Sequence, residues 1–288
     1  MKPPPFEYHD PRSVEETIAL LAEHGEEAKV LAGGQSLVPL LNFRLARPER
    51  LVDINGVGGL DAIAVADGEL RLGALVRHSA LERSPDVAAA VPLLRDAVRL
   101  VGHVQIRNRG TVGGSIVHAD PAAELPVALT ALDARFRVRS VRGEREIRAA
   151  DLFVTHLTTS LEPDELLTEI VAPLPPRGTR SAFVEFARRH GDFALGGAAV
   201  LLTVNGDGRV DRASIALLAA APTPIRVPQA EQALAGRPLD EEAAREAAAL
   251  AVTGIEPTGD IHGSSEYRRG LIEALVRRAI VAAAQGDA

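Results

Sequence analysis

The 288-residue chain contains no cysteine. Without a thiol it cannot form a disulfide, use a cysteine nucleophile or ligate an iron–sulfur cluster. If the protein carries out redox chemistry, a bound organic cofactor must supply it, and any metal cluster must sit on a partner chain.

Aromatic residues and long apolar runs are also scarce. The chain has no tryptophan, two tyrosines and 3% aromatic residues, which is little material for holding an aromatic substrate. No apolar run reaches the roughly 18 residues that a membrane span needs, and the N-terminal MKPPPFEYHD lacks the apolar core of a signal peptide. We therefore expect a cytoplasmic protein without a transmembrane segment.

A concentrated positive charge is missing as well. The net charge is −7, and the arginines are scattered among acidic residues instead of forming a stripe. Nucleic-acid binding therefore has no electrostatic support.

The order of elements predicts two domains, in keeping with the length. A capping box at Ser13-Val-Glu-Glu16 opens a helix, and the first fifty-odd residues follow as strand, glycine turn, helix over 37–45, and strand. Alternating residues over 135–147 predict a hairpin with one wet face. We place a linker at 172–178, which divides an N-terminal domain (1–176, lobes about 1–56 and 57–176) from a C-terminal domain of strands and helices (177–288).

Two glycine pairs stand out, Gly33-Gly34 and Gly113-Gly114, each beside a hydroxyl residue at a strand end or a helix start. Glycine lets backbone N–H groups approach a ligand, and successive N–H groups in a turn form a nest for an anion. Either pair alone could be a tight turn. Two such loops facing each other could hold a diphosphate from both sides.

Competing motifs for nucleotide binding and hydrolysis are incomplete. No G-x-x-x-x-G-K-[ST] occurs, Gly56-Val-Gly58 lacks the third glycine of a dinucleotide fingerprint, and the surroundings of Ser36 lack the last glycine of a nucleophile elbow. A metal site from His103, His118 and Asp120 fits no standard spacing. We therefore favour polar loop residues that support a cofactor.

Three segments carry a family resemblance: Ala32-Gly-Gly-Gln-Ser-Leu37, Asn108-Arg-Gly-Thr-Val-Gly-Gly-Ser115 and His118-Ala-Asp-Pro-Ala-Ala-Glu-Leu-Pro126. With Lys29 before the first, they resemble the medium, FAD-binding subunit of the xanthine dehydrogenase family, which includes carbon monoxide dehydrogenase and bacterial hydroxylases of aromatic N-heterocycles. The resemblance implies an α+β fold: a two-lobed vanillyl-alcohol-oxidase-like (PCMH-type) FAD-binding domain and a C-terminal domain of antiparallel strands and helices.

The resemblance also implies the residues that contact FAD. The first loop would bind the diphosphate through backbone amides, the second would line the diphosphate and ribityl side, and Glu124 would lie near the ribityl chain or flavin edge. Leu166 or Leu167 would pack on a ring face; we choose Leu167. The predicted FAD-binding residues are Lys29, Ala32, Gly33, Gly34, Gln35, Ser36, Leu37, Thr111, Gly113, Gly114, Ser115, Glu124, Leu167 and Phe193, with no catalytic residue and no metal ligand.

Three positions depart from the family pattern. Glu185 stands where relatives often have lysine, and Phe193 stands where they often have tyrosine. The first loop has Gln35 where carbon monoxide dehydrogenases have histidine, which favours an organic substrate. Arg107 and Arg109 could neutralise FAD phosphates, face an iron–sulfur partner or lie on the surface.

The implied role is an electron-transfer subunit. A large subunit with the molybdenum cofactor would hydroxylate the substrate, a small subunit with [2Fe-2S] clusters would pass electrons to FAD on this chain, and an external acceptor would take them. The assembly would be a heterotrimer or a dimer of heterotrimers. Two alternatives stay open: a self-sufficient FAD oxidase of the same fold, and a non-catalytic nucleotide-binding scaffold subunit.

Overall fold

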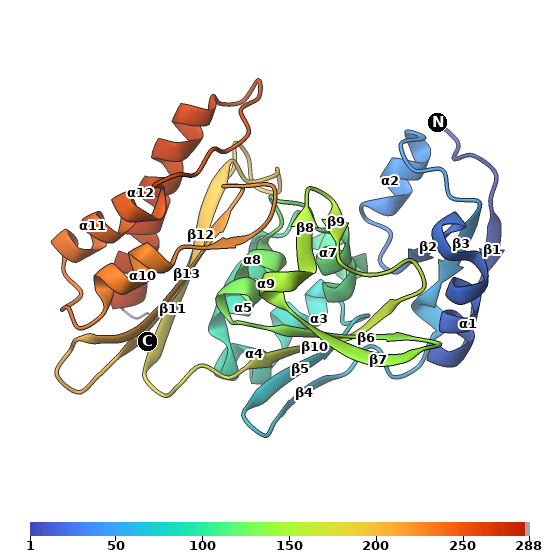
Figure 1. Ribbon diagram of the computed structural model, residues 1–288, viewed down its shortest axis with the longest axis horizontal. Coiled ribbons are helices and arrows are strands. Elements are labelled where there is room, and N and C mark those ends of the chain that lie inside the picture. Colours follow the sequence, from blue (N-terminus) through green and yellow to red (C-terminus); the bar gives the residue numbers. More distant parts are fainter. Residues whose placement is uncertain (286–288) are drawn as a thin grey trace.

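The computed structural model describes residues 1–285, so residues 286–288 of the predicted C-terminal domain lie outside the described residues. Three sheets follow one another from the N-terminal to the C-terminal part of the molecule (Figure 1). A two-stranded hairpin projects from the middle part. Within residues 1–285, no helix has both the length and the apolar character that crossing a bilayer requires.

The N-terminal lobe is a small parallel sheet with two helices. Its strands run in the order β1-β3-β2, so the first strand, which the sequence analysis did not foresee, lies beside the third. The predicted capping box is confirmed, because the Ser13 hydroxyl accepts a hydrogen bond of 3.1 Å from the Glu16 N–H. The elements are β1 (Glu7–His9), α1 (Val14–His24), η1 (Gly25–Glu27), β2 (Ala28–Leu31), α2 (Leu37–Asn42), β3 (Arg50–Asp53) and η2 (Ile54–Gly56).

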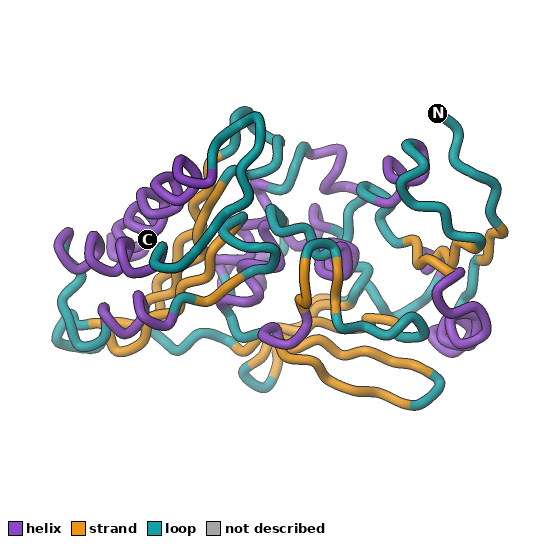
Figure 2. The backbone as a smooth tube through the Cα atoms, turned by 45° about the horizontal axis from the view of Figure 1, so that its top comes forward, coloured by secondary structure: helices purple, strands orange, loops and turns teal. Residues whose placement is uncertain are grey.

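The second lobe is a five-stranded antiparallel sheet whose one face is covered by helices (Figure 2). Leu72, Phe136 and Ile170 point from its strands into a core shared with the helices. The strands are β4 (Ile63–Ala66), β5 (Glu69–Gly73), β10 (Leu166–Pro173), β6 (Arg135–Ser140) and β7 (Gly143–Arg148), in this spatial order. The other elements are α3 (His78–Arg83), α4 (Pro85–Ala90), α5 (Pro92–Leu100), α6 (Val104–Arg109), α7 (Val112–His118), α8 (Glu124–Ala131), α9 (Ala149–Leu152), β8 (Phe153–Thr155) and β9 (Thr158–Thr159).

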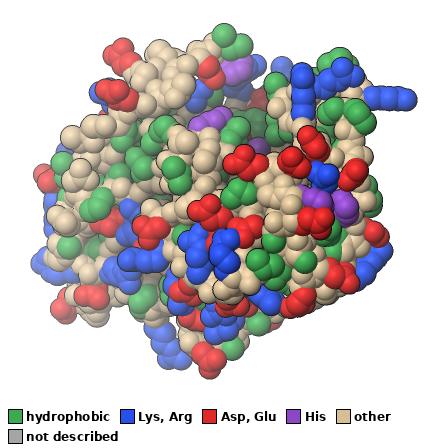
Figure 3. Space-filling model, turned by 45° about the vertical axis from the view of Figure 1, so that its right-hand side comes forward, with side chains coloured by type: hydrophobic (Ala, Val, Ile, Leu, Met, Phe, Trp, Pro, Cys, Tyr) green, Lys and Arg blue, Asp and Glu red, His purple; other side chains and the backbone are tan. Residues whose placement is uncertain are grey.

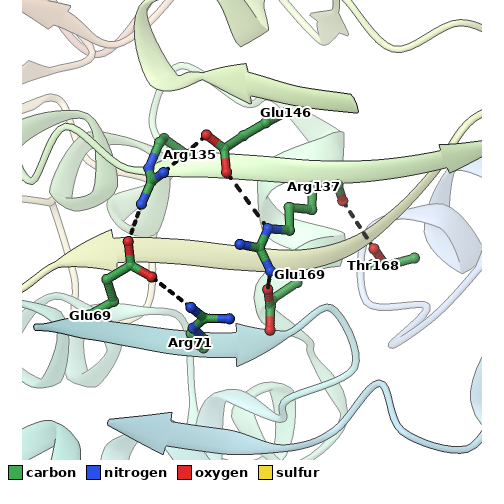
Figure 4. A network of polar contacts seen from close by, with 7 residues as sticks. All are labelled: Glu69, Arg71, Arg135, Arg137, Glu146, Thr168 and Glu169. Atoms are coloured by element: carbon green, nitrogen blue, oxygen red, sulfur yellow. Dashed lines mark hydrogen bonds and ion pairs between the residues drawn. The ribbon is translucent and has the colours of Figure 1, made fainter. Parts of the chain in front are cut away.

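The opposite face of this sheet carries ion pairs between side chains of different strands, some adjacent and some separated by one strand (Figure 4). Arg137 of β6 pairs with Glu169 of β10 at 2.7 Å, and Arg135 pairs with Glu69 of β5. The hairpin β6–β7 thus has the polar, solvent-facing side that the alternation of charged and apolar residues predicted. Ion pairs on a solvated sheet face stabilise a fold by only about 0–1 kcal/mol each, so the apolar side chains on the buried face contribute more to stability.

The C-terminal domain is a four-stranded antiparallel sheet buried on both faces. Along β12, Ala199 and Leu201 pack into the core of the second lobe, while Ala198, Val200 and Leu202 pack against helices α10–α12. A strand covered on both sides has no wet face, which explains its unbroken apolar sequence. The elements are β11 (Thr179–Phe186), β12 (Gly196–Val204), β13 (Val210–Leu218), β14 (Ile225–Arg226), α10 (Pro228–Leu234), α11 (Glu241–Ala251) and α12 (Ser265–Gln285).

One local prediction was wrong, and one helix was not predicted. The arginine-rich segment before the second glycine pair forms helix α6, and its Arg107 is buried in an ion pair of 2.9 Å with Glu82. The helix predicted over 37–45 ends at Asn42, and Arg44 then adopts a left-handed backbone with φ of 59°.

Candidate functional site

The two glycine loops meet at the junction of the lobes. A Cβ on Gly33 would lie 2.5 Å from the carbonyl oxygen of Arg109 and 2.8 Å from the Cα of Gly110, just before the second loop. A Cβ on Gly114 would lie 4.0 Å from the Cβ of Ala32. The structure therefore brings together two segments that are far apart in the sequence, as the paired motifs predicted.

The first loop presents unused amides. Gly34 adopts φ of 71°, and the Gln35 side chain folds back to donate a hydrogen bond of 3.0 Å to the Gly33 carbonyl oxygen. Within residues 1–285, none of the backbone N–H groups of 33–36 donates a hydrogen bond. Such successive free N–H groups form a nest for an anion, and a phosphate fits this donor set.

The second loop differs from the predicted nest because its amides already have acceptors. The Gly113 N–H donates to the Ala74 carbonyl oxygen at 2.9 Å, and the Gly114 N–H donates at 3.1 Å to the Thr111 hydroxyl, which caps α7. A Cβ on Gly113 would lie 2.7 Å from the Cβ of Ala74. The glycines of this loop therefore permit close packing, and the loop forms a wall beside the first.

Basic side chains gather around the first loop. Lys29 lies exposed on the strand that leads into it, and its charge, after the larger effect of burial, lowers the pKa of His118. Burial and the charge of Arg109 lower the pKa of Arg77. The junction therefore has the charge that a diphosphate requires.

Two polar residues that the sequence analysis missed connect the loops. Asn55 donates a hydrogen bond of 2.8 Å from its side-chain Nδ2 to the Ala32 carbonyl oxygen and accepts one of 2.6 Å from Arg77. Arg77 in turn donates to the Arg109 carbonyl oxygen. In the sequence, Asn55-Gly56 indicated only a turn after a strand, so no signal pointed to this link.

Acidic residues lie beyond the second loop. Burial, and then the charge of Glu185, raise the pKa of Glu124 at the start of α8 to about 8. Burial raises the pKa of Glu185 in β11 to about 7, and its Oε2 is buried with no hydrogen-bond partner among the described residues. These carboxyl groups from the two predicted domains interact, and near neutral pH Glu124 is largely protonated while Glu185 is partly protonated.

The remaining predicted residues differ in their surroundings. Leu166 and Leu167 are each 3% exposed, but Leu166 packs with Val14 of the N-terminal lobe while Leu167 belongs to the core of the second lobe. Phe193 is 73% exposed and therefore free to contact a ligand or partner. Ser36 precedes α2 and Leu37 begins it, whereas Ser115 lies in the first turn of α7.

Arginine and histidine residues near the second loop have structural contacts. Arg107, buried by its ion pair with Glu82, also donates to the Val101 carbonyl oxygen, so it neither faces FAD phosphates nor lies on the surface. His103 lies beside His190, with ring centroids 5.9 Å apart. Among the described residues, no group of three or more His, Asp or Glu side chains could hold a metal ion.

One face of the molecule is hollowed near the junction. Figure 3 shows a hollow near the top, between the N-terminal lobe on the right and the rest of the molecule, with histidine side chains at its rim. A separate pocket, lined by Thr130, Arg148 and Arg226, lies away from both glycine loops.

Comparisons with known proteins agree with this geometry. The chain matches the FAD binding domain in molybdopterin dehydrogenase over residues 4–175 and the CO dehydrogenase flavoprotein C-terminal domain over residues 181–283. It is 47% identical to the 6-hydroxypseudooxynicotine dehydrogenase complex subunit alpha of Paenarthrobacter nicotinovorans, covering 98% of this chain and 96% of that protein. It is 42% identical to the nicotine 6-hydroxylase medium subunit of the same organism, covering 98% and 99%.

Solved structures share the whole fold. Quinoline 2-oxidoreductase from Pseudomonas putida 86 matches with a TM-score of 0.95 and 42% identity over 99% of both chains. Carbon monoxide dehydrogenase from Hydrogenophaga pseudoflava, lacking the Mo-pyranopterin moiety, matches with a TM-score of 0.95 and 40% identity over 98% of both chains. The predicted family, the α+β fold with its PCMH-type domain, and FAD as the cofactor of this chain are confirmed. The chain belongs to the FAD-binding flavoprotein subunits of the molybdenum hydroxylase family.

Proposed function

We propose that this chain receives electrons from a small [2Fe-2S] subunit and passes them to an external acceptor, while a large molybdenum-cofactor subunit hydroxylates the substrate. The absence of cysteine supports the division of labour, because every iron–sulfur ligand must then come from another chain. FAD supplies the redox chemistry, and this chain supplies binding, orientation and the electrostatic surroundings.

The convergence of the two glycine loops carries the proposal. The free N–H groups of 33–36 would bind the diphosphate, with Lys29, Arg77 and Arg109 supplying positive charge. The second loop would lie against the diphosphate and ribityl side as a preformed wall. The ring end would lie toward Glu124 and Phe193, with Leu167 remaining our predicted ring contact.

An organic N-heterocycle is the substrate class that we propose for the complex. Gln35 in the first loop separates the chain from the histidine-containing pattern of carbon monoxide dehydrogenases. The identity to the nicotine and 6-hydroxypseudooxynicotine enzymes, 42% and 47%, exceeds the 38% identity to two carbon monoxide dehydrogenase medium chains. Both observations concern this subunit, so the substrate itself must be tested on the whole complex.

We further propose a cytoplasmic heterotrimer or dimer of heterotrimers. For the domains we propose boundaries at 1–176 and 177–288, with the lobes dividing near residue 56. The change from the sheet that contains β10 to the sheet that contains β11 supports the division.

Anaerobic spectroscopy tests the function. The purified chain should show the visible bands of oxidised flavin, and these should not bleach when a candidate N-heterocycle is added. In the co-purified complex the same substrate should bleach them. Bleaching in the isolated chain would favour the self-sufficient oxidase, and a chain without bound flavin would favour the scaffold subunit.

A further inference from the structure

The side chain of Asn55 uses both its donor and its acceptor at the lobe junction. Nδ2 donates to the Ala32 carbonyl oxygen at 2.8 Å and to the Asp53 carboxylate at 2.5 Å, and Oδ1 accepts from Arg77 at 2.6 Å. Two acceptors on one side and a guanidinium on the other allow only this orientation of the amide. The link therefore depends on the amide, and a carboxylate of the same shape could not replace it.

Arg77 completes the link from the second lobe. One of its amino groups contacts Asn55 and the other donates to the carbonyl oxygen of Arg109, while its backbone forms an antiparallel bridge with Thr111. The carbonyl that Arg77 holds is also the atom that Gly33 packs against. The pair Asn55–Arg77 thus holds one carbonyl from each loop, on either side of their contact.

Because of peptide geometry, the hydrogen bond from Asn55 to the Ala32 carbonyl oxygen also affects a group that could bind the ligand. In a trans peptide the C=O of one residue and the N–H of the next point in opposite directions. A hydrogen bond that fixes the Ala32 carbonyl therefore also fixes the direction of the Gly33 N–H, on the side away from Asn55. That N–H is one of those without an acceptor among the described residues.

The carboxylate of Asp53 supports the Asn55–Arg77 link. Asp53 accepts hydrogen bonds from the Tyr8 hydroxyl at 2.7 Å and from the Asn55 N–H at 2.9 Å. Burial opposes the ionisation of Asp53, but these hydrogen bonds outweigh burial and lower its pKa. The resulting carboxylate holds Nδ2 of Asn55 and offsets the repulsion between Arg77 and Arg109.

We propose that Asn55 and Arg77 are positioning residues that aim the Gly33 amide and set the spacing of the two loops for the FAD diphosphate. The inference rests on the proposed assignment of the first loop to the diphosphate. It adds Asn55, and gives Arg77 a second role beside its charge, as residues outside both glycine motifs that control cofactor affinity without being required for the fold.

Flavin-free protein titrated with FAD, and with ADP as a competitor that carries the diphosphate but no flavin, tests this role. Asn55→Asp should weaken both ligands by about tenfold or more, since a lost hydrogen bond to a charged group corresponds to roughly that factor. Asn55→Ala introduces no charge, and Arg77→Lys keeps the charge but loses the two guanidinium amino groups that bond to Asn55 and the Arg109 carbonyl oxygen. Both substitutions should lower the affinity for both ligands by smaller factors. Asn205→Asp, in a turn of the C-terminal domain where a carboxylate can still accept, is the matched control.

Thermal unfolding of the flavin-free variants separates positioning from folding. We expect melting temperatures close to that of the unsubstituted chain for Asn55→Ala and Arg77→Lys. Unchanged FAD and ADP affinities in both Asn55 variants would overturn the inference, and so would a loss of FAD affinity without loss of ADP affinity. If Gly33→Ala and both Asn55 variants keep full FAD affinity, the assignment of the first loop to the diphosphate is wrong. If Gly33→Ala loses FAD affinity while both Asn55 variants keep it, the loop assignment stands and the positioning role is wrong.

Discussion

The two glycine loops look alike in sequence, yet the fold uses them differently. In the first, glycine allows contact with the other lobe and leaves the amides of 33–36 without acceptors among the described residues. In the second, the amides of Gly113 and Gly114 are already bonded to Ala74 and Thr111. The same Gly-Gly pair thus serves ligand binding in one loop and internal packing in the other, and substitutions should separate the two.

The largest effect on FAD affinity should come from Gly33→Ala. The new Cβ would lie 2.5 Å from the backbone oxygen of Arg109, which cannot move aside as a side chain would. To relieve this overlap, the first loop must move away from Arg109 and turn its amides from their binding direction; if the about 1–3 kcal/mol that overpacking costs is lost from binding, FAD affinity should fall roughly 10- to 100-fold. Fluorescence titration measures this, and Gly58→Ala, with nothing within 4 Å of its Cβ, is the control. Equal affinity in both variants would contradict the assignment.

Lowering the pH should reduce the stability of the fold around the second loop, because His78 becomes protonated. His78 lies beneath this loop, contacts the Thr111 carbonyl oxygen at 2.9 Å, and has a pKa lowered from 6.5 to about 4, chiefly by burial. A lowered pKa means that His78 supports the fold fully above pH 6.5 and that this support is lost as the pH falls toward 4, about 3 kcal/mol in all. Chemical denaturation of the chain and of His78→Gln across this range should show a steeper loss in the unsubstituted chain. Parallel curves would exclude a neutral, buried His78.

Gly113→Ala should damage the fold before it damages binding. The added Cβ would lie 2.7 Å from both the Cβ and the carbonyl oxygen of Ala74, so we expect a loss of about 1–3 kcal/mol in the free energy of unfolding. Gly270→Ala, in α12 with open space around it, should instead stabilise by about 0.5–1 kcal/mol. If Gly113→Ala unfolds normally yet releases FAD, the second loop binds the ligand directly.

The smallest effect should come from the acidic side, where Glu185 is partly solvated. Its pKa, raised from 4.5 to about 7, means that its contribution to stability is present below pH 4.5 and lost as the pH rises through 7. Glu185→Gln should therefore raise the melting temperature at pH 8 relative to the unsubstituted chain, with little difference at pH 5. A melting temperature that responds equally at both pH values would show that the carboxyl is ionised throughout.

The sequence predicted the structure correctly where residues close together in the chain determine it. The Ser13 capping box and the alternation over β6 depend on neighbours close along the chain, and both are confirmed. The two glycine pairs indicated a diphosphate site from local chemistry, and the family resemblance that they carry implied FAD. Arg107 was misjudged because its partner Glu82 is distant in sequence, and no pattern indicates that an arginine turns inward.

By itself the sequence determined the lack of cysteine, the positions of the two glycine pairs and local features such as the Ser13 capping box, because these depend on residue chemistry and short-range spacing. Only the tertiary structure decided which amides remain available, that Asn55 and Arg77 join the loops, and that Glu124 and Glu185 interact. Those outcomes depend on hydrogen bonds and charges between segments that only the packing of the lobes and the C-terminal domain brings within reach.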